Sequence, residues 1–336
     1  MVRAGKAATE GRGPIIIGHR GAAGEQPEHT LESYAHAVRG GADFIEPDLV
    51  PTSDGVLVAR HENEIAGTTD VAAHPEFAAR RATKVIDGAA VTGWFTEDFT
   101  FAELKTLRTR ERLPELRPAN TRWDGHFEIP SFDEILALAA SESVRTGRPI
   151  GVYPETKHPG YFAGIGLPLE PTLITQLEAA GYTGPDDAAF IQSFEVANLK
   201  ALRTMTRVRL IQLVGDGRPA DDAAMTYDAM TTPAGLAAIA AYADGVGPAK
   251  SRIIPRDAAG RSLPPTDFVA DAHRAGLLVH PYTFRSENIF LPAELRHGDD
   301  PARHGDAAGE YAAFFAAGVD GVFSDFPAAA FAARAA

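Results

Sequence analysis

Acidic residues occur with a spacing that suits one face of a β-strand. Glu46 and Asp48 are two residues apart after an apolar run, and Glu155 has the same spacing from Lys157. Side chains alternate between the two faces of a strand, so both members of each pair point the same way. Converging carboxylates repel, by roughly 4 kcal/mol for two charges about 4 Å apart at an effective dielectric constant of about 20. A hard divalent cation removes this repulsion, and oxygen ligands favour Ca²⁺, or secondly Mg²⁺, over zinc.

Two cationic side chains accompany these predicted metal ligands. Arg20 follows a strand-like run at residues 15–18, and Lys157 follows Glu155. Three carboxylates, one divalent cation and these two side chains leave a single net positive charge. A phosphate diester carries a single negative charge, so we predict that the metal and the two cations together bind a diester.

Two histidines could move the protons that such a reaction requires. His19 ends the first strand-like run, and His61 follows Val58-Ala59-Arg60, beyond the second strand-like run. Hydrolysis of a diester takes a proton from the attacking oxygen and gives one to the leaving alcohol, and histidine does both near neutrality. The competing interpretations are a buried core histidine for His19 and a surface turn histidine beside Glu62 for His61.

A regular alternation of strands and helices can position these residues. Eight short apolar runs, at 15–18, 43–46, 150–153, 189–192, 209–212, 243–246, 277–280 and 321–324, precede helical patterns at 30–39, 132–143, 170–180, 195–204, 234–241, 266–275 and 309–317. Such alternation indicates parallel strands covered by helices. Eight units favour an α/β fold of the closed (βα)₈ TIM-barrel type, in which reacting groups lie at the carboxyl ends of strands.

The alternation also suggests the organisation of the chain. We predict a disordered tail at residues 1–13, one barrel domain at 14–336, and within it an insertion subdomain at 62–130, after the second strand. The insertion is too long for a plain connection, and we expect it to contain a charged helix at 101–112. Residues 215–233 form a second, smaller excursion. The first 13 residues have no apolar run, so we expect no signal peptide there.

Composition excludes several classes of function. The chain has no cysteine, which excludes disulfides, thiolate nucleophiles, iron–sulfur clusters and thiolate zinc sites. The formal net charge of −13 makes nucleic acid and anionic membranes unsuitable partners. No apolar run reaches the roughly 18–20 residues that cross a bilayer, so we expect no membrane insertion. A monomer and a homodimer both remain open.

The order and spacing of several motifs resemble those of the glycerophosphodiester phosphodiesterases, in particular the bacterial periplasmic branch. The resemblance covers nearly everything from residue 15 to residue 327. Its matching segments are His19-Arg20-Gly21, residues 27–32 (PEHTLE), residues 41–49 (GADFIEPDL), His61, residues 153–157 (YPETK), Gln192-Ser193-Phe194, residues 242–248 (YADGVGP), residues 279–283 (VHPYT) and residues 323–327 (FSDFP).

The resemblance implies a specific activity and a role for each matching residue. The activity is metal-dependent hydrolysis of small glycerophosphodiesters to sn-glycerol 3-phosphate and an alcohol, on a (βα)₈ barrel with a small subdomain inserted after the second strand. Glu46, Asp48 and Glu155 match the ligands of a metal that is usually Ca²⁺ or Mg²⁺. His19 and His61 match the acid–base pair, and Arg20 and Lys157 the phosphate-binding cations.

Other residues at strand ends are predicted to contact substrate. Gln192 and His280 either line the pocket or hydrogen-bond behind it. Phe194, Tyr282 and Phe323 wall the alcohol pocket or pack in the core. Glu28 either orients the site or favours the start of a helix through its charge, and Thr30 is expected to cap that helix. The remaining histidines are expected at the surface: His36, His74, His126, His158, His273, His297 and His304.

Two details depart from the family pattern. Gly67 stands where the family often has arginine, which bears on substrate preference, and residues 27–30 read Pro-Glu-His-Thr where Pro-Glu-Asn-Thr is usual. Location stays divided between the periplasm or exterior, after removal of a signal, and the cytoplasm.

Two other functions compete with this one. A phospholipase D-like or lysophospholipase D activity on lipid diesters needs an exposed apolar rim or a basic patch, against which the net charge argues. A non-catalytic surface binding protein should have lost a histidine or a carboxylate, and none is missing here.

Overall fold

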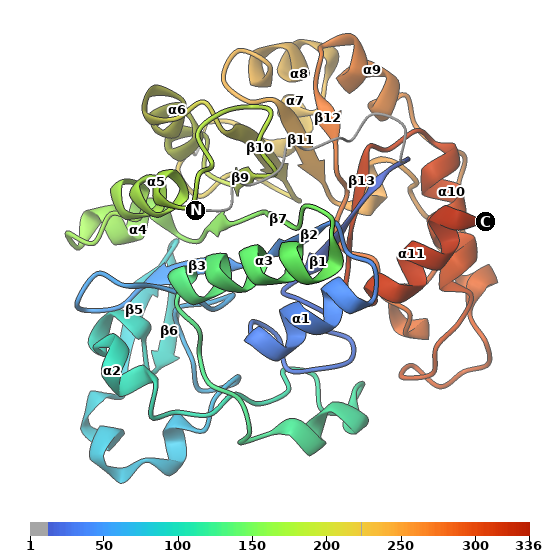
Figure 1. Ribbon diagram of the computed structural model, residues 1–336. Helices are drawn as coiled ribbons and strands as arrows, with labels where there is room; N and C mark the ends of the chain where they lie inside the picture. Colours follow the sequence, from blue (N-terminus) through green and yellow to red (C-terminus); the bar gives the residue numbers. More distant parts are fainter. Residues whose placement is uncertain (1–12, 223) are drawn as a thin grey trace.

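Parallel strands surrounded by helices form the centre of the computed structural model, which describes residues 13–222 and 224–336 (Figure 1). The tail predicted at residues 1–13 lies, except for Gly13, outside the described residues. The strands are β1 (Ile15–His19), β2 (Phe44–Glu46), β3 (Asp48–Pro51), β4 (Leu57–Ala59), β5 (Ala82–Ile86), β6 (Ala89–Gly93), β7 (Gly151–Val152), β8 (Glu155–Thr156), β9 (Phe190–Ser193), β10 (Arg209–Val214), β11 (Gly245–Pro248), β12 (Leu278–Val279) and β13 (Gly321–Ser324).

Within the described residues, all of these strands except β4, β5 and β6 occupy the eight positions of a closed (βα)₈ barrel, with β2 and β3 sharing one position and β7 and β8 sharing another. Strand β1 pairs in parallel with both β2 and β13. The parallel pairing continues through β2–β7, β3–β8, β8–β9, β9–β10, β10–β11 and β11–β12. Backbone hydrogen bonds from Asp320 N to Val279 O (2.9 Å) and from Phe323 N to Pro281 O (3.1 Å) join the last two positions. The barrel predicted from the alternation is therefore confirmed.

Prolines divide the second and third barrel strands at the level of the predicted site. Pro47 separates β2 from β3, and Pro154 lies between β7 and β8, because a proline has no N–H to donate to the ladder. The register places His19 beside Glu46 and Asp48 beside Glu155. Strand pairing alone thus brings residues from three strands together at the carboxyl ends.

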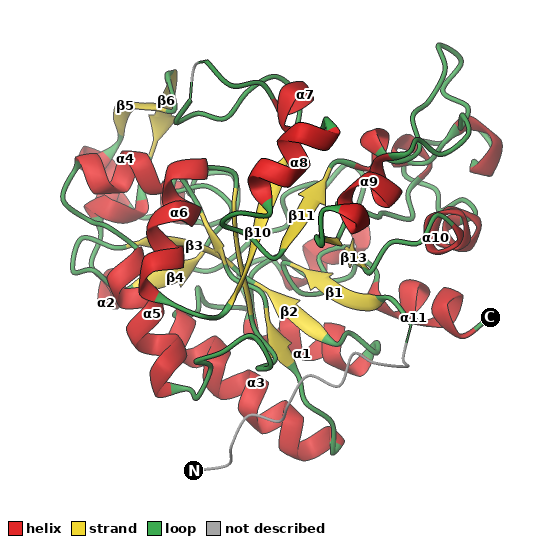
Figure 2. Ribbon diagram, turned by 90° about the horizontal axis from the view of Figure 1, so that it is seen from above, coloured by secondary structure: helices red, strands yellow, loops and turns green. Residues whose placement is uncertain are grey.

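Helices cover the outside of the barrel, as the view in Figure 2 shows. The helices of the described residues are α1 (Leu31–Arg39), α2 (Phe101–Leu104), which belongs to the insertion, α3 (Phe132–Thr146), α4 (Pro159–Gly164), α5 (Glu170–Ala179), α6 (Val196–Met205), α7 (Tyr227–Met230), α8 (Pro233–Ile239), α9 (Phe268–Arg274), α10 (Ala307–Ala316) and α11 (Pro327–Ala335). Thr30 caps α1 as predicted, since its hydroxyl accepts a hydrogen bond from Ser33 N (3.1 Å). None of the helices in the described part of the chain is both long and apolar enough to cross a bilayer.

The predicted insertion follows β4 and leads to α3. It contains an antiparallel hairpin of β5 and β6, the short helix α2 and several turns, and it lies to one side of the barrel in Figure 1. The prediction of a helix at 101–112 is wrong beyond Leu104. There the backbone bonds elsewhere in the insertion: Thr109 N donates to Phe127 O (2.8 Å), and Arg108 N donates to the Asp70 carboxylate (2.8 Å).

Candidate active site

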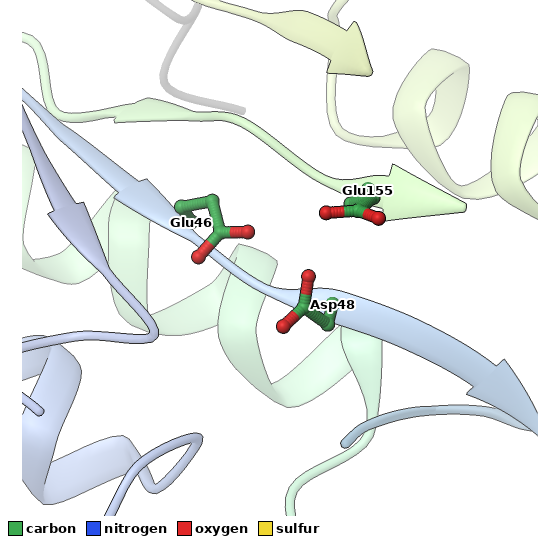
Figure 3. Close-up of side chains that lie close together, drawn as sticks. All are labelled: Glu46, Asp48 and Glu155. Atoms are coloured by element: carbon green, nitrogen blue, oxygen red, sulfur yellow. The ribbon is translucent and has the colours of Figure 1, made fainter. Parts of the chain in front are cut away.

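Three buried carboxylates converge at the carboxyl ends of the second and third barrel strands. One oxygen each of Glu46, Asp48 and Glu155 lies within 4.8 Å of the others, and Figure 3 shows the three groups pointing toward one another. Each side chain comes from a strand end beside the proline break. The geometry therefore agrees with the predicted set of metal ligands.

The three carboxyl groups differ in their affinity for protons. Burial and the neighbouring charges of Asp48 and Glu155 raise the pKa of Glu46 well above its usual range. Burial, reinforced by Asp48, raises the pKa of Glu155 to about 8. Burial alone would raise the pKa of Asp48 too, but Lys157, His29 and Arg20 hold it well below its usual range. Glu155 thus keeps its proton near neutral pH, and a divalent cation could relieve the repulsion among the three groups instead.

Hydrogen bonds fix the carboxylates in place. Arg20 N donates to Glu46 Oε2 (2.7 Å), and Gln192 Nε2 donates to Glu46 Oε1 (3.1 Å). His29 Nε2 lies 2.9 Å from Asp48 Oδ2. The other amide atom of Gln192, Oε1, is buried without a partner among the described residues. Three carboxylates and an amide oxygen without a hydrogen-bond partner are the kind of oxygen ligands that suit a hard divalent cation.

The two predicted phosphate-binding cations lie at the edge of this cluster. Arg20 Nη1 donates to Glu28 Oε2 (3.0 Å), and Arg20 Nε is 3.2 Å from Asp48 Oδ2. Arg112, from the insertion, binds both oxygens of Glu28 (2.8 and 2.6 Å). Glu28 therefore orients Arg20. Lys157 Nζ donates to Glu155 Oε1 (3.0 Å).

His19 is held by a carboxylate from the last barrel strand. Its Nδ1 is 2.6 Å from Asp325 Oδ1, and Arg117 and Arg285 bind the other oxygen of Asp325 (2.5 and 3.0 Å). Burial would raise the pKa of Asp325, but Arg117, Arg285 and His19 outweigh burial and keep it well below its usual range. An ionised carboxylate only accepts, so Nδ1 of His19 carries the proton and Nε2 is the acceptor of the ring.

His61 lies just beyond β4 with its Nδ1 2.8 Å from Glu62 Oε1. That oxygen lies off the direction of the ring N–H, so Nδ1 has no aligned hydrogen-bond partner in the described part of the chain. Burial, with Arg20 and Lys157 nearby, lowers the pKa of His61 to about 3. Burial and Arg20 also lower the pKa of His19, although Asp325 opposes them. Both imidazoles are therefore neutral in the ligand-free site at pH 7.

A cavity of about 430 Å³ connects these groups. A volume of this size suits a small organic ligand. Its lining is His19, Arg20, Glu46, His61, Glu155, Lys157, Gln192, Phe194, Leu213, Tyr282, Thr283, Arg285 and Phe323. Of the predicted site residues, Asp48 and His280 are absent from this lining, and Asp48 belongs to the carboxylate cluster beside it.

Comparison with known proteins places the chain in a family. The model of the glycerophosphoryl diester phosphodiesterase family matches residues 19–329. The chain belongs to this family. A glycerophosphodiester phosphodiesterase of Arabidopsis thaliana is 38% identical over 327 residues, which are 93% of this chain and 84% of the relative. One from Haemophilus influenzae is 29% identical and covers 93% of this chain and 87% of its own length.

Solved structures share the fold of this family member. A glycerophosphodiester phosphodiesterase from Agrobacterium tumefaciens aligns with a TM-score of 0.59 at 19% identity, over 95% of this chain and 99% of its own. A phosphodiesterase from Oleispira antarctica, solved with the product sn-glycerol 3-phosphate, aligns with a TM-score of 0.59 at 19% identity, over 96% and 97%. The family model and the Arabidopsis relative confirm the resemblance to the phosphodiesterase family, and these two structures confirm the fold.

His280 does not lie where the sequence predicted it. Its Nδ1 is 2.9 Å from the hydroxyl of Tyr153, its ring packs on Phe190, and it borders a different cavity, which Arg209 and Pro14 also line. Side chains inside a barrel form layers, and His280 belongs to the layer below the one that holds Tyr282. Burial lowers its pKa to about 4. The prediction that His280 contacts substrate is corrected: it is a neutral core histidine.

Several residues around this phosphodiesterase site were not predicted. Asp325 lies within a motif that carried the resemblance, but its contact with His19 spans 306 residues. Arg117 and Arg285 gave no signal of their own. His158 was expected at the surface, yet its side chain is only 15% exposed and lies between two carboxylates. Such contacts depend on how distant segments pack.

Proposed function

We propose that this protein hydrolyses glycerophosphodiesters to sn-glycerol 3-phosphate and an alcohol. The observation that carries the proposal is one cavity lined by two imidazoles, three cationic side chains and two carboxylates, which belong to a cluster of three buried carboxylates. sn-Glycerol 3-phosphate is also the product bound in the Oleispira antarctica phosphodiesterase of similar fold.

Glu46, Asp48 and Glu155 would hold the divalent cation, with Ca²⁺ the first candidate and Mg²⁺ the second. When bound, the cation supplies a Lewis acid that stabilises negative charge on phosphate oxygens. Arg20 and Lys157 add positive charge beside the same oxygens, and this positive charge stabilises the negative charge that develops there in the transition state. Gln192 fixes Glu46 through its amide nitrogen, and its buried amide oxygen has no partner among the described residues.

His19 acts as the base in this proposal, because Asp325 leaves Nε2 as its acceptor. The glycerol 2-hydroxyl gives its proton to Nε2 while its oxygen attacks phosphorus. Asp325 stabilises the imidazolium that forms. A cyclic glycerol phosphate results, and the bond from phosphorus to the oxygen of the other alcohol breaks.

His61 gives the proton that the leaving alcohol needs. The pKa of about 3 in the ligand-free site is too low for a proton donor. A negative charge about 4 Å away contributes roughly 4 kcal/mol at a dielectric constant of about 20, or about three pKa units. Binding of the anionic diester therefore brings the pKa of His61 to roughly 6, where a histidine is an effective acid.

Water then opens the cyclic phosphate with the two roles exchanged. Neutral His61 takes a proton from the attacking water, and the His19 imidazolium returns its proton to the 2-oxygen of glycerol as that bond to phosphorus breaks. Both rings recover their starting states. Phe194, Tyr282 and Phe323 border the same cavity and would contact the alcohol part of the substrate.

Phosphorus NMR of product formation tests this proposal directly. A panel of water-soluble diesters (glycerophosphocholine, glycerophosphoethanolamine and glycerophosphoglycerol) and one lysophospholipid is incubated with the protein, with and without chelator. We expect sn-glycerol 3-phosphate from the soluble diesters and its loss on chelation. Preferential cleavage of the lysophospholipid would favour the lipid activity instead, and no cleavage at all would contradict both enzymatic functions.

Substitution of each histidine tests the assigned chemistry. General acid or base catalysis contributes about 10²–10⁴ in rate, so His19→Ala and His61→Ala should each lose at least about 99% of turnover. Thermal unfolding with and without Ca²⁺ serves as the control, because neither substitution removes a predicted metal ligand. An alanine variant with more than about a tenth of the original rate would exclude that histidine from catalysis.

A further inference from the structure

A line of alternating acidic and imidazole groups leads from His61 to the insertion. His61 Nδ1 is 2.8 Å from Glu62 Oε1, Glu62 Oε2 is 3.0 Å from His158 Nε2, and His158 Nδ1 is 2.6 Å from Asp87 Oδ2. Glu62 follows β4, His158 precedes α4, and Asp87 is at the turn between β5 and β6. Three segments distant in sequence thus meet beside the cavity.

The backbone at the outer end of this line is unusual. Asp87 and His158 both have positive φ angles, 48° and 46°. The sequence Asp87-Gly88 suits such a turn between two strands. The local sequence does not explain the positive φ of His158. This residue precedes Pro159, and a residue before proline favours extended backbone. A strained conformation persists when surrounding contacts hold it, and strain of this kind collects at functional sites.

His158 is a cation between two anions. Burial would lower its pKa, but the hydrogen bonds to Asp87 and Glu62 raise it to about 9. Burial would raise the pKa of Glu62, but His158 and His61 hold it well below its usual range. Lys157 and Glu195 also face His158, the first opposing and the second favouring its positive charge. Glu62 therefore presents a fixed carboxylate to His61.

We propose that Glu62, held by His158 and Asp87, positions His61 for proton transfer. Glu62 directs the Nδ1–H of His61 toward itself and leaves Nε2 for the leaving alcohol. The oxygen lies off the N–H direction in the ligand-free site, and contacts of this kind often tighten only when substrate binds. The insertion thereby takes part in catalysis through Asp87, although Asp87 is not itself in the cavity lining.

The proposal rests on the proposed role of His61, and leaving-group dependence separates the two. Three variants are measured: Glu62→Gln, His158→Asn and Asp87→Asn, since asparagine tolerates a positive φ. Each is assayed on glycerophosphocholine, whose alkoxide leaving group needs a proton, and on the 4-nitrophenyl ester of glycerol phosphate, whose leaving group does not. We expect kcat on glycerophosphocholine to fall roughly 10- to 100-fold with little change in KM, and kcat on the nitrophenyl ester to change less than about threefold.

Matched controls come from the same insertion. His74 also lies between two carboxylates, Asp70 (3.4 Å) and Glu76 (3.2 Å), but contacts no residue of the site. His74→Asn and Glu76→Gln should leave both rates unchanged. In the double variant Glu62→Gln/Asp87→Asn, the loss should not exceed that of Glu62→Gln alone, because groups that act in series are not additive.

Two results overturn this inference in distinguishable ways. In the first, the Glu62, His158 and Asp87 variants lose equal activity on both substrates, or lose none, while His61→Ala is inactive. That result would refute the positioning role and leave the proposed function intact. Full activity of His61→Ala would refute both. Asp87→Glu keeps the negative charge that Asp87→Asn removes. A glycerophosphocholine rate for Asp87→Glu close to that of the original protein would support the positioning role against a merely structural one.

Discussion

Both candidate catalytic histidines have a carboxylate at Nδ1, and each carboxylate is itself held by cationic groups. Asp325 faces His19 and is bound by Arg117 and Arg285. Glu62 faces His61 and is bound by His158. Because a carboxylate at one ring nitrogen fixes the tautomer and stabilises the imidazolium, the two histidines enter the reaction with the opposite nitrogen available. The two carboxylates differ in burial, since Asp325 is buried and the side chain of Glu62 is 42% exposed.

Removing the charge of Asp325 should slow the reaction without removing the cavity. Asp325→Asn leaves a group of the same size, but its amide can donate to His19 Nδ1 and shift the ring proton to Nε2. The variant also loses the charge that stabilises the imidazolium. We expect kcat to fall by about 10²–10⁴, with KM changed far less. Steady-state kinetics on glycerophosphocholine measures this effect.

The control for Asp325→Asn is a variant that keeps the charge. Asp325→Glu retains a carboxylate at a shifted position and should be slower than the original protein but faster than Asp325→Asn. Circular dichroism and thermal unfolding check that Arg117 and Arg285 still fold into place. A kcat within about threefold of the original for Asp325→Asn would contradict the role of Asp325.

The sequence predicted the inner residues of the site better than those behind them. His19, Glu46, Asp48 and Glu155 could be placed because their strand positions and spacing follow from local alternation. Asp325, Arg117 and His158 could not, since each meets its carboxylate or imidazole partner across a sequence separation of 71 residues or more. His280 was misplaced because sequence parity does not tell which layer of a barrel a side chain occupies.

At the level of elements, the barrel strands supply the reacting groups and the insertion supplies groups that hold them. Arg112 binds Glu28, Arg117 binds Asp325, and Asp87 binds His158. The insertion therefore contacts the surroundings of both histidines and of Arg20. Its elements were hard to predict. The Asp87-Gly88 pair was an available signal for the β5–β6 hairpin, whereas the helix after Phe101 ended early because partners elsewhere took its backbone groups.

The His158 contacts should stabilise the protein in a pH-dependent way. The pKa of His158 is raised from 6.5 to about 9 in the folded state, so the folded protein binds the proton more tightly than the unfolded chain. The stabilisation is complete below about pH 6.5 and is lost as pH rises through about 9. Because Glu62 and Asp87 are partly exposed, we expect only roughly 1–2 kcal/mol.

Urea unfolding of the original protein and His158→Asn at several pH values tests this. The difference in free energy of unfolding should be largest at pH 6 and should shrink toward zero by about pH 9.5. His74→Asn is the matched control, because His74 also lies between two carboxylates of the insertion. A difference that stays constant with pH would mean that His158 contributes through packing and not through its charge.

At the scale of the whole molecule, the barrel was predictable because each of the eight units carries its own apolar run and seven of the runs have a predicted helix beside them; α11, after the last run, was not predicted. The barrel closes by repetition of one local unit, which is why eight runs in the sequence correspond to eight strand positions. Two features depend on the closed barrel and could not be predicted from any local pattern. They are the breaks in the strands at Pro47 and Pro154 and the order of the side-chain layers. The net charge of −13 also concentrates cations around the protein, which favours occupation of an acidic metal site.

Metal binding should stabilise the whole barrel, because the three carboxylates join the second and third strands. A ligand that binds only the folded state adds about 2.7 kcal/mol at a concentration 100 times its Kd, so Ca²⁺ or Mg²⁺ should raise Tm and a chelator should lower it. When no cation is bound, burial and the neighbouring carboxylates raise the pKa of Glu46 well above its usual range and that of Glu155 to about 8, so the folded protein binds protons more tightly here than the unfolded chain. The metal-free protein therefore loses stability as pH rises from about 4.5 to about 8, and the gain from metal should grow over the same range.

Calorimetry at pH 5.5 and pH 8 measures both effects. Glu46→Gln and Glu155→Gln should weaken the shift, and the exposed Glu76→Gln should leave it unchanged. An equal shift in Glu155→Gln and in the original protein would show that the cation binds elsewhere.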